Sequence, residues 1–244
     1  MADGFKILIP GRIGSERLPR KLLQEAGGKT LIQMTWERCK ESNADEVIVI
    51  TDSDEIFRHI SDLGGEAFIS TTNHDSGTDR VQEYAKTAGL EAQEVVINVQ
   101  GDEPLIDIEA VNQLGDFMHA NKYTYGTIAQ HFSSNTDLLD PNKVKVVLND
   151  DNSAIEFFRD APVVVKDFSK VVLHHVGIYA YQVDFLHTFA SLSKTKNELN
   201  LKLEQMRALD NALPLHVLEL NLDESWGIDT EEDLIRLRKH LELN

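Results

Sequence analysis

The stretch Val95-Val96-Ile97-Asn98-Val99-Gln100-Gly101-Asp102-Glu103-Pro104 decides the fold of this chain. Its apolar, β-branched first half is typical of a buried strand, and Gly101 with Pro104 indicates a sharp turn directly after that strand. In an open α/β sheet, ligands lie beyond the carboxyl ends of the strands. Asp102 is therefore well placed to hold a cation against a bound phosphate. The alternative is a solvated acidic turn, because Gly-Asp is also common turn chemistry.

A basic loop near the N-terminus favours the first interpretation. It follows a short apolar strand expected at residues 5–9, and it reads Pro10-Gly11-Arg12-Ile13-Gly14-Ser15-Glu16-Arg17-Leu18-Pro19-Arg20-Lys21. Glycines let backbone N–H groups approach phosphate oxygens, and Arg and Lys supply charge-assisted hydrogen bonds. In a chain this acidic, the loop predicts a polyphosphate cradle, and a solvated basic loop is the alternative.

Two common phosphate motifs are excluded. Gly28-Lys29-Thr30 is similar to the tail of a P-loop, but Leu23 stands where the first Gly of that motif belongs. We therefore expect this triplet to form the turn before a helix over about residues 31–41. The basic loop also lacks the G-x-G-x-x-G spacing of a dinucleotide-binding turn, since its glycines are Gly11 and Gly14 only.

Composition excludes several classes of partner. The 244 residues carry 24 Lys and Arg against 41 Asp and Glu, and the net charge of -17 repels nucleic acid and acidic membranes. The single cysteine, Cys39, cannot form an internal disulfide, which fits a reducing compartment. No run of about 18 apolar residues and no signal-peptide pattern occurs, so we expect a cytoplasmic protein without a membrane span.

Along the chain, strands and helices alternate in the first half and the alternation loosens in the second. This pattern predicts one α/β domain over residues 1–244, with an antiparallel excursion at about 140–195. We expect strands at 5–9, 46–51, 67–69, 95–99, 125–131, 144–148, 154–158, 171–181 and 215–220, and helices at about 31–41, 54–63, 77–88, 108–120, 199–209 and from 231 onward.

Three polar motifs allow two interpretations each. Asp52-Ser53-Asp54 is similar to the D-x-D metal triplet of nucleotide-sugar glycosyltransferases, but the same residues make an ordinary helix N-cap. Ser76-Gly77-Thr78-Asp79-Arg80 either caps the next helix or lines a nucleotide base. Asp229 either caps the C-terminal helix or belongs to a site.

Several motifs taken together match one family along nearly the whole chain. The basic loop through Leu22 matches the signature Pro-Ala-Arg-x-x-Ser-x-Arg-Leu-Pro-Gly-Lys-Pro, and the stretches at 76–80, 98–104, 175–181, 203–207 and 227–233 match later motifs in the same order. In this combination the sequence resembles the CMP-Kdo synthetases, the 3-deoxy-manno-octulosonate cytidylyltransferases. The resemblance implies a single-domain, Rossmann-like nucleotidyltransferase fold with a mixed sheet, and a homodimer formed through the excursion.

The resemblance also implies a reaction and its residues. The anomeric hydroxyl of an eight-carbon 3-deoxy-2-keto sugar acid (Kdo) would attack the α-phosphorus of CTP, giving CMP-Kdo and pyrophosphate for lipopolysaccharide biosynthesis. Catalytic residues would be Arg12, Lys21, Asp102 and Asp229, with Mg²⁺ held by Asp102 and Asp229. Nucleotide contacts would come from Pro10, Gly11, Arg12, Ser15, Arg17, Lys21, Ser76, Gly77, Thr78, Arg80 and Gln100. The sugar would contact Arg159, His175, Tyr179, Glu204 and Gln205, with Arg159 gripping its carboxylate and His175 adding a donor.

The departures from the family pattern lie in two places. Gly11, Arg20 and Leu22 replace the Ala, Gly and Pro of the signature, and residues 158–163 differ from the usual Ser-Arg-Ala-x-Ile-Pro. Because that second region borders the sugar in the family, an 8-amino analogue of Kdo remains an alternative acceptor. A metal-dependent glycosyltransferase using Asp52-Ser53-Asp54 and an inactive nucleotide-binding module are the other classes left open.

Overall fold

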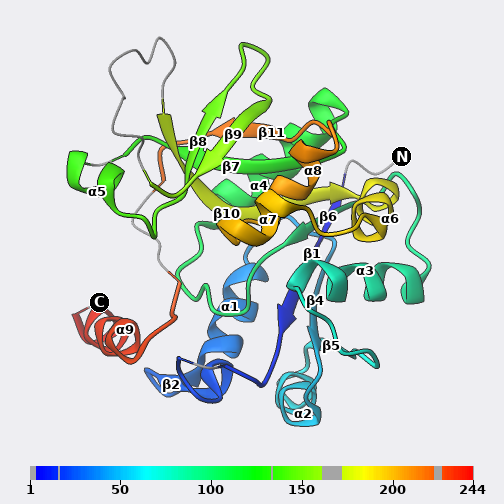
Figure 1. Ribbon diagram of the computed structural model, residues 1–244. Helices are drawn as coiled ribbons and strands as arrows, with labels where there is room; N and C mark the ends of the chain where they lie inside the picture. Colours follow the sequence, from blue (N-terminus) through cyan, green and yellow to red (C-terminus); the bar gives the residue numbers. More distant parts are fainter. Residues whose placement is uncertain (1–3, 16, 133, 161–171, 223–226, 244) are drawn as a thin grey trace.

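A nine-stranded mixed sheet forms the centre of the computed structural model (Figure 1), which describes residues 4–15, 17–132, 134–160, 172–222 and 227–243. Seven strands follow the order β11-β7-β10-β6-β1-β4-β5, and β8 joins β10 and carries β9 at the edge. The strands are β1 Phe5–Gly11, β4 Glu46–Thr51, β5 Glu66–Ile69, β6 Val95–Asn98, β7 Tyr125–Gln130, β8 Lys145–Leu148, β9 Ala154–Phe158, β10 Val172–Gln182 and β11 His216–Glu219, with a separate ribbon of β2 Glu25–Ala26 and β3 Lys29–Thr30.

The first half of the sheet is parallel, as expected. β1 pairs in parallel with β4 on one side and with β6 on the other, and Leu8 lies opposite both Ile48 and Asn98. Because neighbouring parallel strands end at the same edge of a sheet, the basic loop after β1 and the turn after β6 start side by side. The sheet itself therefore brings the cationic residues near Asp102.

The second half of the sheet is antiparallel except for β11, which pairs in parallel with β7, and this confirms the predicted excursion. β10 lies between β6 and β7 and runs antiparallel to both, and it also pairs with β8 of the β8–β9 hairpin at the top of Figure 1. Between Val176 and Tyr179, β10 carries two extra residues relative to β7. Two extra residues keep His175 and Tyr179 on the same face of the strand. Residues 161–171, where part of the excursion was expected, lie outside the described residues.

Helices cover both faces of the sheet. One hydrophobic core buries residues of β1 and β6 under α1, α2 and α4, and a second core packs α3, α6 and α8 on the opposite face. None of the helices in the described part of the chain is long and apolar enough to cross a membrane. Their bounds are α1 Leu31–Cys39, α2 Asp54–Asp62, α3 Gly77–Ala88, α4 Ile108–Asn121, α5 Asn135–Leu139, α6 Val183–Ser191, α7 Lys196–Leu201, α8 Met206–Asp210 and α9 Glu231–Leu243, with a 3-10 turn η1 at Lys21–Leu23.

The helix expected at about 199–209 is a wrong prediction. Two short helices, α7 and α8, replace it, and Lys202 between them has left-handed backbone angles, with φ of 54°. A residue in this conformation ends a helix, because the chain can no longer continue the right-handed hydrogen-bond pattern. As a result, Glu204 and Gln205 lie in a tight connection instead of on one helical face.

The local structure agrees with the prediction that Gly28-Lys29-Thr30 is not part of a P-loop. Thr30 is the N-cap of α1 and accepts a hydrogen bond from the Gln33 N–H. The Lys29 ammonium forms an ion pair with Glu37 at 2.6 Å. Lys29 is thus part of the α1 surface and does not line the cavity described next.

Candidate active site

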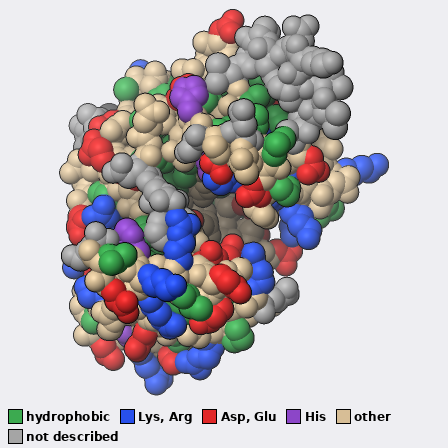
Figure 2. Space-filling view, turned by 90° about the vertical axis from the view of Figure 1, so that its left-hand side faces the viewer, with side chains coloured by type: hydrophobic (Ala, Val, Ile, Leu, Met, Phe, Trp, Pro, Cys, Tyr) green, Lys and Arg blue, Asp and Glu red, His purple; other side chains and the backbone are tan. Residues whose placement is uncertain are grey.

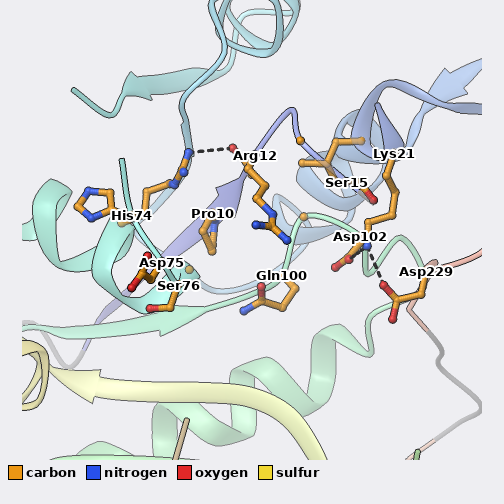
Figure 3. A pocket seen from close by; sticks show the side chains of 16 residues that line it. Pro10, Arg12, Ser15, Lys21, His74, Asp75, Ser76, Gln100, Asp102 and Asp229 are labelled. Carbon is orange, nitrogen blue, oxygen red and sulfur yellow. Dashed lines mark hydrogen bonds and ion pairs between the residues drawn. The ribbon is translucent and has the colours of Figure 1, made fainter. Parts of the chain in front are cut away.

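A cavity of about 300 Å³ opens where β1, β6 and the N-terminus of α3 meet (Figure 3). It lies at the carboxyl edge of the parallel strands, where the sheet topology predicts a ligand site. Its lining includes most of the residues expected on the nucleotide side: Pro10, Gly11, Arg12, Ser15, Lys21, Ser76, Gly77, Arg80, Gln100, Asp102 and Asp229. In the space-filling view, a hollow in the surface is bordered by both basic and acidic side chains (Figure 2).

Asp52 holds the backbone of the basic loop, residues 10–21, in place. One carboxylate oxygen of Asp52 accepts a hydrogen bond from the Ile13 N–H at 3.0 Å, and the other accepts one from Arg80 at 3.1 Å. The buried Arg80 guanidinium also donates to the Gly11 carbonyl at 3.3 Å. Arg12 is exposed and extends from this anchored backbone into the cavity, between Pro10 and Gln100 in Figure 3. The loop therefore presents the Arg12 guanidinium to the cavity from a backbone that is held in place by hydrogen bonds.

These contacts settle the role of the Asp52-Ser53-Asp54 triplet. The Ser53 side chain accepts a hydrogen bond from the Ile56 N–H and caps α2, as the capping interpretation predicts. Since both oxygens of Asp52 are already hydrogen-bonded within the protein, the triplet does not present a free pair of carboxylates to a metal.

Lys21 links the two acidic residues of the candidate metal site. Its ammonium donates a short hydrogen bond to Asp102 and one of 2.9 Å to Asp229. Burial disfavours the charged lysine, but the two carboxylates outweigh it, so the pKa of Lys21 is raised. Burial likewise opposes the Asp229 carboxylate, yet Lys21 and Arg17 lower its pKa. The three charges form one mutually stabilised cluster, and Arg17 joins it by pairing with Asp229 at 2.9 Å without lining the cavity.

Asp229 is not the cap of the C-terminal helix. The Thr230 hydroxyl accepts a hydrogen bond from the Asp233 N–H, and Asp233 in turn accepts from the Thr230 N–H at 2.9 Å. This reciprocal pair satisfies the first turn of α9. The Asp229 carboxylate is consequently left to face Lys21.

Two carboxylates that share one ammonium are close enough together to bind one divalent cation. No group of three or more potential metal-binding side chains occurs among the described residues. Mg²⁺ commonly takes one or two carboxylates and completes its shell with water and substrate phosphates. The residues present therefore fit a magnesium ion that arrives with a nucleotide. Glu103, the neighbouring acid, packs against Gly227, and burial beside Asp102 raises its pKa to about 8.

The loop before α3 contains site residues that the sequence motifs did not indicate. His74 and Asp75 line the cavity just before Ser76, which caps α3 by accepting from the Asp79 N–H at 3.1 Å. The Glu83 carboxylate holds this loop, because it accepts hydrogen bonds from the Thr71 N–H at 3.0 Å and from the His74 ring at 2.6 Å. The signal available in the sequence was the polar run directly after β5, at the same edge of the sheet.

A second cavity of about 340 Å³ lies beside β10 and the α7–α8 connection. His175, Tyr179, Glu204 and Gln205, all expected around the sugar, line it together. The Tyr179 hydroxyl donates to the Gln205 side-chain oxygen at 3.0 Å. The amide nitrogen of Gln205 is buried and has no hydrogen-bond partner among the described residues. A buried unpaired donor is costly, so its presence in a cavity lining points to a polar ligand there.

The His175 ring is buried and neutral, and its Nε2 is already hydrogen-bonded within the protein. Burial lowers its pKa to about 3. The single hydrogen of the Thr127 hydroxyl is taken by the Ile178 carbonyl at 2.7 Å. The Nε2–H of His175 therefore donates to Thr127, at 3.0 Å, and leaves Nδ1 as the unprotonated nitrogen.

One hydrogen bond holds the N-terminus of α3, which borders the first cavity, against the α7–α8 connection, which borders the second. The Thr78 hydroxyl does not line the first cavity but donates to the Glu204 carboxylate at 2.5 Å. A further cavity of about 420 Å³ shares Asp75 and Ser76 with the first and Lys202, Leu203 and Glu204 with the second. The nucleotide-side loop and the α7–α8 connection are thus directly adjacent.

Comparisons with known proteins agree with this geometry. The profile of a family described as Cytidylyltransferase matches residues 6–217. The chain belongs to this cytidylyltransferase family. It is similar to the 3-deoxy-manno-octulosonate cytidylyltransferases of Saccharophagus degradans (38% identity, over 97% of this chain and 98% of that one) and of Polynucleobacter necessarius subsp. necessarius (39%, over 98% and 96%). It also resembles the solved structure of a CMP:2-keto-3-deoxy-manno-octonic acid synthetase complexed with CTP, with a TM-score of 0.89, 32% identity and coverage of 98% and 99%.

The departures of this cytidylyltransferase from the family signature have local physical causes. A Cβ atom at Gly11 would lie 2.8 Å from the Leu22 side chain, so the missing methyl at 11 makes room for Leu22. Arg20, where the signature has Gly, has left-handed backbone angles with φ of 53° and pairs with Glu55 at 2.5 Å. Arg20 therefore has the backbone conformation that a Gly favours, and Leu22 fills the space that a side chain at position 11 would take.

One expected sugar contact is not brought to the second cavity of the cytidylyltransferase. The Arg159 guanidinium donates to the backbone carbonyls of Leu201 at 2.8 Å and Lys202 at 3.3 Å, and it does not line that cavity. These carbonyls are left unsatisfied by the end of α7, so Arg159 caps the helix. The structure therefore does not bring Arg159 to the cavity where its contact with a sugar carboxylate was expected.

Proposed function

We propose that this cytidylyltransferase transfers the cytidylyl group of CTP to Kdo, for lipopolysaccharide biosynthesis. The observation that carries the proposal is the hydrogen bond from Thr78 to Glu204, which holds the N-terminus of α3, bordering the first cavity at Ser76 and Gly77, against a residue that lines the second. The first cavity suits a nucleoside triphosphate. The second suits a polyhydroxylated acceptor, because its lining is polar and includes His175, Tyr179 and Gln205.

The chain's residues act by positioning and by charge neutralisation. The acceptor oxygen forms a bond to the α-phosphorus, the bond from that phosphorus to the bridging oxygen breaks, and pyrophosphate leaves with the electron pair. Arg12, Ser15 and Lys21 would bind the triphosphate and compensate the charge that develops on it. Fixing the two reactants in adjacent cavities removes most of the entropic cost of their encounter.

Asp102 and Asp229 would hold Mg²⁺ in this scheme. When bound, the ion neutralises phosphate charge and lowers the pKa of the attacking hydroxyl. No dedicated side-chain base is then required, and the hydroxyl proton passes to water. Before the ion binds, Lys21 holds the Asp102 and Asp229 carboxylates close together, since it hydrogen-bonds to both.

The assembly and location of the enzyme are part of the proposal. β9 pairs only with β8 among the described strands, and Ile155 on it is 43% exposed, so this edge suits a second copy of the chain. We infer a homodimer, to be checked by sedimentation equilibrium, and a cytoplasmic site of action, where CTP is available.

Isotope placement tests the transfer itself. With Kdo and Mg²⁺, CTP labelled at the α-phosphate should pass its label to the sugar product, and CTP labelled at the γ-phosphate should pass all of its label to pyrophosphate. A label from the γ-phosphate in the sugar product would mean a kinase, and no labelled sugar from either would refute the proposal.

A further inference from the structure

The second cavity must hold a carboxylate if the acceptor is a sugar acid. A carboxylate removed from water needs a cation or several donors. The expected cation, Arg159, already donates hydrogen bonds to the Leu201 and Lys202 carbonyls. Another cation in the cavity lining, or several uncharged donors, would therefore have to bind the carboxylate.

Lys202 supplies the missing charge. Burial lowers the pKa of both histidines in the lining, that of His175 to about 3 and that of His174 to about 4, so Lys202 is the one cation among the described residues that line the second cavity. Glu204 has partners in Thr78 and Arg207. The Lys202 side chain is exposed and forms no ion pair with any residue that the structure describes.

The backbone at Lys202 gives an independent argument. Its left-handed angles, φ 54° and ψ 48°, normally favour Gly or Asn at the end of a helix. A Lys in this backbone conformation costs folding stability. When such a residue also lines a cavity, a role in that site can explain why it is there. Lys122 offers a matched comparison, since it ends α4 with φ 56° and ψ 37° but lines no cavity described above.

We propose that the Lys202 ammonium binds the carboxylate of the acceptor sugar acid and so selects acids over neutral sugars. This inference rests on the proposed function and names the acceptor contact within it. Because Arg159 holds the carbonyl of Lys202, it acts as a positioning residue that fixes the backbone from which this lysine reaches the cavity.

The test compares Lys202→Asn and Lys202→Gly with Lys122→Asn and Lys122→Gly. Both pairs relieve a left-handed lysine, so each of the four variants should melt at or above the wild-type temperature. Loss of one charged hydrogen bond should raise the KM for Kdo by roughly 10- to 100-fold in the Lys202 variants only. The Kd for CTP should stay unchanged in all four, and Lys202→Arg should restore most of the KM.

A neutral analogue isolates the carboxylate contact. The wild-type enzyme should prefer Kdo to its carboxamide, and this preference should fall to nearly one in Lys202→Asn. If Lys202→Asn keeps both the wild-type KM and the wild-type preference, the inference is wrong and uncharged donors such as the Gln205 amide hold the acid. If the wild-type enzyme itself makes no CMP-Kdo, the proposed function fails instead, so the two failures are distinguishable.

Discussion

The Lys21 ammonium is hydrogen-bonded to the carboxylate of Asp102, 81 positions further along the chain. The two residues meet because they follow β1 and β6, which are adjacent parallel strands. Each charge compensates the other in a partly buried site, so removing one leaves its partner without compensation. The phosphate-binding and metal-binding halves of the candidate site are therefore held together before any ligand binds.

Asp102→Asn and Asp229→Asn should each lower kcat by at least about 100-fold, a typical loss for one electrostatic contact to a transition state. A neutral amide is a poor ligand for Mg²⁺ and no longer pairs with Lys21. Asp54→Asn is the control, because a glycosyltransferase-like metal triplet would require that exposed residue. Steady-state kinetics at saturating Mg²⁺, with folding checked by circular dichroism, decides the matter. Near-normal turnover in either of the first two variants would remove that carboxylate from the site.

Lys21→Ala should weaken CTP binding by about tenfold or more, whereas Lys29→Ala should leave it unchanged. Lys21 lines the first cavity, and Lys29 is paired with Glu37 on the surface of α1. The loss corresponds to one charge-assisted hydrogen bond. Isothermal titration with CTP measures the affinity of each variant. An equal loss of affinity in both would mean that Lys29 also binds the phosphates, as the P-loop interpretation requires.

Glu83→Gln should destabilise the protein near neutral pH, and its effect should vanish in acid. Burial raises the pKa of Glu83, but hydrogen bonds from Ser70, His74 and Thr71 outweigh it and lower the pKa from 4.5 to about 2. A depressed carboxyl pKa contributes stability that is present above pH 4.5 and is lost as the pH falls toward 2. Urea unfolding of both proteins across this window tests the linkage. A difference in unfolding free energy that stays constant with pH would contradict it.

Kdo should be preferred to its 8-amino analogue. Four of the five expected sugar contacts line the second cavity in this structure, and only Arg159 does not. The half-buried Glu204 carboxylate could accommodate an ammonium, but Thr78 and Arg207 already occupy it. The measurement is kcat/KM for both sugars at fixed CTP and Mg²⁺. A preference of more than tenfold for the amino sugar, about 1.4 kcal/mol of transition-state discrimination, would identify that analogue as the substrate.

The parallel half of the fold could be predicted from the sequence because each strand is an apolar run that ends in turn residues. β4 has the predicted bounds, and the turn at Asp102 lies where the strand pattern places it. The family motifs placed Lys21 and Asp102 in one site, but their direct pairing was not predicted, since sequence spacing alone does not reveal which strands are neighbours.

The sugar side was harder to predict, because it depends on backbone detail. No residue pattern signalled that Lys202 would adopt left-handed angles and split the expected helix, since Lys is usually a good helix former. The commitment of Arg159 to the end of α7 follows from that break, as it exposes the carbonyls that Arg159 caps. Glu83 was overlooked for a similar reason, because its partners come from a loop without regular periodicity.

Kdo-dependent release of pyrophosphate from CTP tests the central claim most directly. The purified protein with CTP, Mg²⁺ and Kdo should release one pyrophosphate for each CMP-Kdo formed, and release should stop when Kdo is omitted or Mg²⁺ is chelated. Pyrophosphate release that is independent of Kdo, or none under any of these conditions, would contradict the account.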